Sequence, residues 1–321
     1  MDAALPPSVA AALDALAQGR SGRRLAEKAQ AISTAYRAGS PSCGIIRDAD
    51  DALAYALTRL PATYAAAVSA LDALARRAPA FRPARLLDVG CGPGSASLAA
   101  LQVLDRPASL RLVDGNQPLL DLARRLLDGG PTAELQRVDL AAADLGRADV
   151  VLAGYVLTEL PDAPAFSLAE RLWAATDGAL VIVEPGTPRG WARLMSVRSM
   201  LINAGAAIAA PCPHAAPCPV TPPDWCHFSR RLPRLRAHRL AKGAEAPFED
   251  EKFAYLAATR PDVTLIAAAP RILAPPRRDK VEVALKLCAP SGDLVQRRVP
   301  TRDRAALRTV RRADWGDALE D

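Results

Sequence analysis

A glycine-rich turn that follows a short apolar run is the feature that most restricts the fold of this chain. The run from Leu86 to Ser95 reads LLDVGCGPGS, in which the first residues predict a strand and the last ones open a helix. Glycines at such a turn let the backbone approach a ligand closely, and the start of the helix offers free N–H groups. The segment therefore predicts a ligand site at the end of a strand in an α/β domain.

Short apolar runs around this turn alternate with amphipathic stretches, which is typical of a parallel sheet covered by helices on both faces. The predicted strands are Arg85 to Val89, Leu110 to Val113, Leu135 to Val138, Val150 to Ala153 and Ala179 to Val183. Helices are predicted within residues 8 to 80, at Pro118 to Leu127, at Ala165 to Ala175 and around Glu249 to Ala258. Later β-like runs, expected to close the sheet edge as antiparallel strands, are Arg271 to Leu273, Val281 to Cys288 and Leu294 to Val299.

The glycines follow the pattern G-x-G-x-G, with an acidic residue two positions before the first of them. A dinucleotide-binding fold would carry G-x-G-x-x-G here, and the observed pattern instead resembles the first motif of class I S-adenosylmethionine methyltransferases. Asp114 follows the next strand, where an acid can accept hydrogen bonds from ribose hydroxyls. Asp139 resembles the residue that caps the adenine amino group in that family. The resemblance implies S-adenosylmethionine as cofactor, bound by Asp88, Gly90, Gly92, Gly94, Asp114 and Asp139.

The residues after the fourth predicted strand, where such enzymes recognise the methyl acceptor, match neither the Asn/Asp-Pro-Pro-aromatic signature nor the Pro-Cys signature of nucleic-acid methyltransferases. Tyr155, Glu159 and Glu184 are candidates for this side of the site. Each also has a purely structural interpretation, which is packing against the next helix for Tyr155 and Glu159 and a charge partner at a helix N-terminus for Glu184. No catalytic residue is assigned.

Four cysteines form a second constellation, with spacing C-x5-C-x7-C and a distant fourth: Cys212, Cys218, Cys226 and Cys288. Crowded thiolates usually share a metal. The spacing lacks the C-x2-C knuckles of zinc fingers and suits an iron–sulfur cluster, which takes four cysteines. Zinc on the same thiolates, or with His214 or His227 replacing one, stays open, as do unligated buried cysteines.

Several motifs together resemble the methyltransferase-like assembly factors of the mitochondrial small ribosomal subunit and their bacterial relatives. They are the runs around the four cysteines, Glu251 to Leu256, and the closing Trp315-Gly316-Asp317. This resemblance spans roughly Ala35 to Asp317. It implies a class I methyltransferase fold, a [4Fe–4S] cluster on Cys212, Cys218, Cys226 and Cys288, and association with the small ribosomal subunit and its rRNA.

Charge indicates an RNA partner independently, because arginine clusters neutralise phosphates. The first cluster is Arg230, Arg231, Arg234, Arg236, Arg239 and Lys242, and the second is Arg297, Arg298, Arg302, Arg304, Arg308, Arg311 and Arg312. Both could also be solvated faces. Trp225 and Phe228 could stack on unpaired bases, although packing around the metal explains them as well.

The chain is expected to divide into an N-terminal helical region (1–80), a methyltransferase-like domain (81–205 and 249–299), a Cys-rich basic metal-binding insertion (206–248) and a basic C-terminal tail (300–321). No apolar run reaches the roughly 20 residues of a membrane span, and no secretory signal is found at the start. A cytoplasmic monomer without a membrane partner is expected. Its function is predicted as an RNA methyltransferase, a non-catalytic rRNA-binding assembly factor or, third, a small-molecule methyltransferase.

Overall fold

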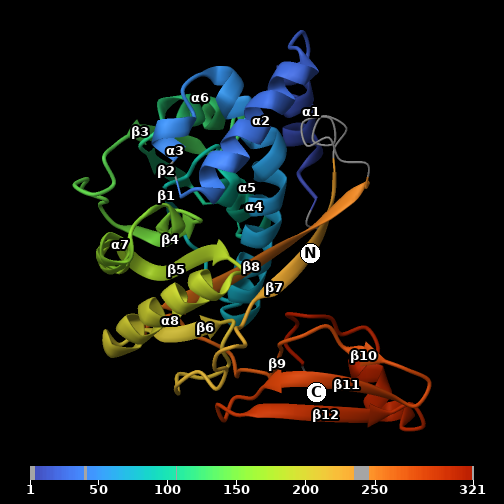
Figure 1. The fold of residues 1–321 in the computed structure, drawn as a ribbon. Helices are drawn as coiled ribbons and strands as arrows, with labels where there is room; N and C mark the ends of the chain where they lie inside the picture. The colour runs from blue at the N-terminus through green and yellow to red at the C-terminus, as the bar shows by residue number, and fades with distance from the viewer. Residues whose placement is uncertain (1–3, 40–41, 106, 235–245, 320–321) are drawn as a thin grey trace.

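The protein is described by a computed structural model that covers residues 4–39, 42–105, 107–234 and 246–319 (Figure 1). A mostly parallel sheet of eight strands lies at its centre, in the order β3-β2-β1-β4-β5-β8-β6 with β7 paired to β8. Its parallel strands are β1 (Arg85–Val89), β2 (Ser109–Asp114), β3 (Thr132–Arg137), β4 (Ala148–Gly154) and β5 (Thr176–Pro185). The five strands predicted from the sequence are confirmed, and the α/β arrangement resembles that of class I methyltransferases.

Helices cover both faces of this sheet, which explains why its central strands β4 and β5 are mostly apolar and buried. Successive residues of a strand point to opposite faces, so Leu86 joins one buried core and Leu87 joins the other. The first core includes α4 (Ala49–Arg77), α5 (Ser95–Val103) and α6 (Gln117–Leu126), and the second includes α7 (Asp162–Ala174) and α8 (Pro188–Asn203). Within the described residues, no helix is both long enough and apolar enough for a membrane crossing.

The N-terminal residues form helices, as predicted, and α4 is the longest of those described. This helix begins at its N-cap Asp48, whose side chain accepts a hydrogen bond from the Asp51 N–H, and it is buried along most of its 29 residues. Its neighbours are α1 (Pro7–Ala17), α2 (Gly22–Arg37) and α3 (Ser42–Ile45). Because α4 contacts α2, α5 and β8, it joins the N-terminal helices to the sheet.

The helix predicted around Glu249 to Ala258 is wrong, because these residues form strand β8 (Phe248–Thr259). Its second half lies between β5 and β6 (Ala207–Ala210), where both faces are covered. A strand buried on both faces loses the two-residue alternation that distinguishes it from a helix in sequence. The polar first half pairs with β7 (Phe228–Pro233) in an antiparallel ladder.

The last β-like runs are strands, but their predicted place at the edge of the main sheet is wrong. They form a second antiparallel sheet from β9 (Arg271–Ile272), β10 (Arg277–Arg278), β11 (Glu282–Cys288) and β12 (Leu294–Pro300). With α10 (Arg304–Val310) this sheet encloses its own small core around Leu285 and Val310. The edge of the main sheet beyond β5 is already taken by β8, β6 and β7. Figure 1 shows the second sheet below the main one.

Candidate functional site

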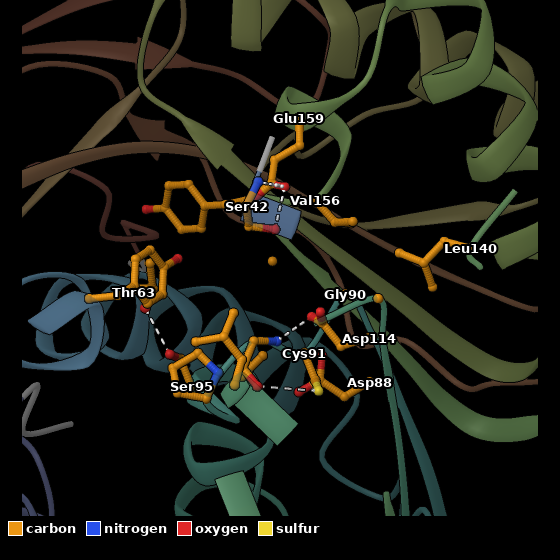
Figure 2. Close-up of a pocket in the computed structure, with 18 of the residues that line it drawn as sticks. Ser42, Thr63, Asp88, Gly90, Cys91, Ser95, Asp114, Leu140, Val156 and Glu159 are labelled. Atoms are coloured by element: carbon orange, nitrogen blue, oxygen red, sulfur yellow. Dashed lines mark hydrogen bonds between the residues drawn. The ribbon is translucent and has the colours of Figure 1, made fainter. Parts of the chain in front are cut away.

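A cavity of about 480 Å³ lies at the carboxyl ends of β1, β2 and β4. Figure 2 shows Asp88, Asp114 and the glycine turn on one side of it, and Ser42 and Glu159 on the other. Of the residues predicted to bind the cofactor, five line this cavity: Asp88, Gly90, Gly92, Asp114 and Asp139. Gly94 does not line it and instead takes the left-handed N-cap position of α5, with φ of 85°. The structure therefore brings the sequence-predicted residues together at one place.

Gly90 and Gly92 both have positive φ, of 68° and 55°, which side chains rarely tolerate. A Cβ atom on Gly90 would lie 2.4 Å from Cγ2 of Val156, whereas one on Gly92 would meet nothing within 4 Å. The Gly92 N–H donates to Oδ2 of Asp114 over 2.8 Å. The turn is therefore held against β2, with free space above Gly92 into which a ligand fits.

Asp88 is completely buried at the end of β1. Its Oδ2 accepts hydrogen bonds from the Ser97 N–H at 3.0 Å and from the Ser97 hydroxyl at 2.7 Å. Its Oδ1 has no hydrogen-bond partner within the described part of the chain. Burial raises the pKa of this carboxyl to about 7. A buried acceptor without a donor is costly in a folded protein, so this atom marks a place where a ligand donor would fit.

Asp114 is the last residue of β2, and Asp139 follows β3. Oδ1 of Asp114 accepts the Asn116 N–H at 2.8 Å, and burial raises the pKa of Asp114 to about 6. Asp139 is exposed, and its Oδ1 accepts the Ala141 N–H at 3.0 Å. The two acids thus differ: Asp114 is rigidly placed beneath the glycine turn, and Asp139 lies at the rim.

The N-terminal helices supply cavity residues that the sequence did not reveal: Tyr36, Ser42, Tyr55 and Thr63. The Thr63 hydroxyl donates to Oγ of Ser95 at 2.9 Å, which links α4 to the first turn of α5 (Figure 2). The only signal for Thr63 was its polarity within a long alanine- and leucine-rich helix. The other three lie too far from the glycine turn in sequence to be paired with it by pattern.

Two groups hold the side of the cavity where a methyl acceptor would lie. Glu159 accepts the Tyr36 hydroxyl at 3.1 Å and, through its other oxygen, the Ser42 hydroxyl at 2.7 Å and the Ser42 N–H at 2.9 Å. Tyr155 has φ of 62°, and its hydroxyl donates to Glu251 at 2.9 Å. Burial raises the pKa of Tyr155 and of Tyr36 well above the usual range. These tyrosines keep their protons at neutral pH and cannot serve as bases.

Glu184 lies outside the cavity wall and is completely buried. Its Oε2 is 3.4 Å from Nη1 of Arg193 on α8. Burial raises the pKa of Glu184 to about 7, although the charge of Arg193 acts in the opposite direction. This carboxyl is therefore a structural partner of α8 rather than part of the ligand site.

The four predicted metal ligands line one small apolar cavity where the segment between β6 and β7 meets β8 and β11: Cys212, Cys218, Cys226 and Cys288. All four are free thiols. Sγ of Cys288 is 3.2 Å from Nε2 of His214, and Cys288 pairs with Arg271 of β9 in the second sheet. As they stand, no three His, Cys, Asp or Glu side chains in the described ranges are arranged to hold one metal ion.

The first arginine cluster is partly neutralised by ion pairs within the β7–β8 hairpin. Arg231 pairs with Asp250 at 2.8 Å and Arg234 with Glu249 at 3.2 Å. Arg236, Arg239 and Lys242 lie outside the described residues. Phosphate contact by this cluster stays a prediction.

The two aromatic side chains beside that cluster, Phe228 and Trp225, both contact other residues of the protein. Phe228 is buried and packs against Phe253 and Tyr255, with ring centroids 6.1 and 5.3 Å apart. The Trp225 Nε1–H donates to the Gly186 carbonyl at 3.0 Å, and its ring stacks on His227. Packing therefore explains both residues.

The model of a protein family described as mitochondrial small ribosomal subunit Rsm22 matches residues 49–320. This range includes the glycine turn and all four cysteines. The chain belongs to the Rsm22 family. It is 30% identical over 289 residues to the human mitochondrial ribosome assembly protein METTL17, covering 83% of this chain and 62% of METTL17. It is 26% identical over 319 residues to Rsm22-cox11 tandem protein 2 of Schizosaccharomyces pombe, of which it covers 42%. This Rsm22-family chain thus spans between two fifths and two thirds of the length of these relatives.

The prediction of a cytoplasmic location is wrong, because the family and both relatives are mitochondrial by name. The lack of a recognisable secretory signal separates secreted proteins from others but does not distinguish compartments inside the cell.

Solved methyltransferase structures are similar to this Rsm22-family chain in fold. The magnesium protoporphyrin IX methyltransferase of Synechocystis with bound SAH aligns with a TM-score of 0.41 and 17% identity, covering 63% of this chain and 84% of that one. The ribosomal protein L11 methylase of Lactobacillus delbrueckii aligns with a TM-score of 0.36 and 17% identity, covering 60% and 76%. Both likenesses concern the fold alone.

Proposed function

We propose that this protein binds S-adenosylmethionine in the cavity beside the glycine turn and acts in assembly of the small ribosomal subunit, in contact with its rRNA. The observation that carries the proposal is the convergence of Asp88, Gly92 and Asp114 on one cavity in a chain of the Rsm22 family. The membership of the Rsm22 family and the similarity to the ribosome assembly protein METTL17 support the ribosomal role. A monomer is proposed, as the sequence predicted.

The residues of the cavity suit the parts of this cofactor, which when bound carries an activated methyl group. Asp114 has carboxylate oxygens placed to accept the ribose hydroxyls. Asp139 at the rim would accept from the adenine amino group. The open space above Gly92 lets the ligand approach the backbone, and the unpaired Oδ1 of Asp88 offers an acceptor for a ligand N–H or a bridging water.

Binding without methyl transfer is the form of this function that the acceptor side favours. Glu159 already accepts three hydrogen bonds from Tyr36 and Ser42, and Tyr155 is tied to Glu251. With the tyrosines protonated, none of the described side chains on that side is placed to remove a proton from an acceptor. RNA methyl transfer is the second candidate, because positioning alone can accelerate a reaction when the acceptor is already nucleophilic. Methylation of a small molecule ranks third, since it gives no role to the arginines.

The deciding experiment combines calorimetric binding of S-adenosylmethionine with a transfer assay on immature small subunits. We expect binding by the wild type, loss of binding in Asp114→Ala, and wild-type binding in Asp128→Ala, an exposed aspartate outside the cavity. No labelled methyl group should enter the rRNA. Incorporation that Asp114→Ala abolishes would establish the enzyme instead, and absence of cofactor binding by the wild type would overturn the proposal.

We further propose that the cysteine cavity holds a [4Fe–4S] cluster, with zinc as the alternative. Four free thiols line one largely apolar cavity, and burial raises the thiol pKa of Cys212 and Cys226. Positive charge acts in the opposite direction, from Arg198 and Arg271 on Cys212 and from Arg271 on Cys226. Metal ligation needs thiolates. Both zinc and an iron–sulfur cluster take cysteine thiolates as ligands, and a [4Fe–4S] cluster takes four of them.

Iron and acid-labile sulfide, measured after anaerobic purification, test the cluster directly. We expect both in near-equal amounts, together with loss of both in Cys218→Ser. Zinc alone at one ion per chain would replace the cluster with the alternative, and a metal-free protein of unchanged stability would reject a metal centre of either kind.

A further inference from the structure

A second large cavity, here called the arginine cavity, lies beside the last turns of α4. It measures about 540 Å³ and is bounded by the last turns of α4, by β7 and β8, and by the chain from Thr309 to Leu319. It shares no residue with the cofactor cavity. Phe228, Tyr255 and Arg271 separate it from the cysteine cavity, because they line both.

The wall of this cavity is strongly basic. Two aspartates line it together with five arginines, which are Arg76, Arg77, Arg230, Arg271 and Arg312. One of the aspartates, Asp72, is held by Arg76 at 2.8 Å. Arg312 is exposed and, within the described ranges, makes no hydrogen bond or ion pair. The cavity thus carries an excess of positive charge, which favours an anionic ligand.

Two donors at its wall lack acceptors among the described residues: Nη1 of Arg77 and Nε1 of Trp315 are both buried without a hydrogen-bond partner. The remaining contacts of Arg77 and Arg271 are with backbone carbonyls: Arg77 donates to Ala209 at 3.1 Å, and Arg271 to Pro211 at 3.1 Å and Gly316 at 2.8 Å. Burial and then the charge of Arg271 lower the pKa of Arg77. Like charges held together away from water are stabilised when an anion lies between them.

We propose that the arginine cavity binds a phosphate group of a single-stranded RNA segment. Guanidinium groups match phosphate oxygens in a bidentate manner, and Trp315 at the wall offers an N–H and an aromatic edge to the attached nucleotide. A strand fits better than a free nucleotide, because further exposed arginines precede Arg312: Arg304 and Arg308 on α10, and Arg311 at its C-cap. This inference rests on the proposed contact with rRNA and names where one contact lies.

The test is fluorescence anisotropy of the full chain with a labelled single-stranded RNA, at two salt concentrations. Arg312→Glu should weaken binding at least about tenfold, which corresponds to about 1.4 kcal/mol. The matched control is Arg125→Glu, which reverses the same charge on an exposed residue of α6 that neither lines the cavity nor lies near α10 in sequence. This control should lose markedly less affinity. Thermal unfolding of both variants verifies that they fold.

The outcomes separate this inference from the proposed function. If the wild type binds RNA and both variants weaken it equally, the arginine cavity is not the site, and the proposed function stands. If the wild type binds no RNA but binds AMP, and Arg312→Glu removes that binding, the ligand is a free nucleotide and the RNA proposal is overturned. If the wild type binds neither RNA nor AMP, both the arginine cavity and the proposed rRNA contact are overturned.

Discussion

The cofactor cavity and the cysteine cavity are built in opposite ways. The first takes its acids and glycines from the ends of adjacent parallel strands, within about fifty residues of sequence. The second joins a proline-rich segment after β6 to Cys288 at the end of β11, in a different sheet. Local turn geometry therefore shapes the first cavity, whereas the second exists only when the two sheets are docked. The arginine cavity is likewise formed by segments far apart in the sequence, from α4, from β7 and β8, and from residues 309–319.

This difference predicts that cysteine changes act on the whole molecule. We expect Cys226→Ser to remove the iron and to lower the free energy of unfolding by several kcal/mol, because loss of a metal is among the largest single-site effects. Cys91→Ser, on the glycine turn outside the cysteine cavity, should keep its iron. Metal analysis and denaturant titration measure both. Equal loss of iron in the two variants would break the distinction between the cavities.

Changes on the glycine turn should instead act locally. Gly90→Ala combines a φ of 68° with a clash against Val156, so we expect a loss of about 1–3 kcal/mol and of cofactor binding. Gly92→Ala has the positive φ but no clash, so its stability should suffer less. Calorimetry with S-adenosylmethionine and thermal unfolding compare the two. The comparison fails if Gly90→Ala binds the cofactor as tightly as the wild type.

The pH dependence of stability tests whether the buried carboxyl of Asp88, at the cofactor cavity, is protonated in the folded state. Its folded pKa of about 7 exceeds the ordinary value of 3.8, so the folded state holds a proton that the unfolded chain releases. Its contribution is fully present below pH 3.8 and is lost as the pH rises through about 7, with a slope of at most about 1.4 kcal/mol per pH unit. In Asp88→Asn, the free energy of unfolding measured in urea should therefore fall less steeply between pH 5 and 7 than in the wild type, by up to about 1.4 kcal/mol per pH unit. An unchanged slope would show that Asp88 is ionised in the fold.

The smallest expected effect concerns the link between α4 and α5. Thr63→Val removes the hydrogen bond to Ser95 and should cost about 1 kcal/mol, with up to tenfold weaker cofactor binding. Thr58→Val is the matched control, because Thr58 is buried on the same helix, donates only to the Ala54 and Tyr55 backbone carbonyls, and does not itself line the cavity. Its stability should fall similarly while its cofactor affinity stays unchanged. Equal affinities for the two variants would remove α4 from the site.

Sequence reasoning worked where a site depends on neighbouring elements. The strand, turn and helix around Gly90 follow from local pattern, and Asp114 and Asp139 follow from the end points of the next strands. Cys288 could be grouped with the other cysteines only because thiols are rare and share a chemistry. Thr63, Ser42 and Tyr36 belong to common residue types without a distinctive sequence motif, and their positions depend on how the N-terminal helices pack.

The errors have the same origin. The second half of β8 is enclosed on both faces and loses its alternation, so its pattern could not separate strand from helix. The strands of the second sheet were predicted at the edge of the main sheet, because β7 and β8 were not predicted as strands. In the structure, β8, β6 and β7 already occupy that edge.

The position of β11 has a consequence for biosynthesis. Arg271 and Cys288 leave the ribosome after all the residues that line the cofactor cavity. During synthesis, three thiols are therefore present before the fourth, and the wall between the cysteine and arginine cavities is incomplete. If these cavities bind metal and RNA as proposed, both ligands would be acquired only after the last part of the chain has been made.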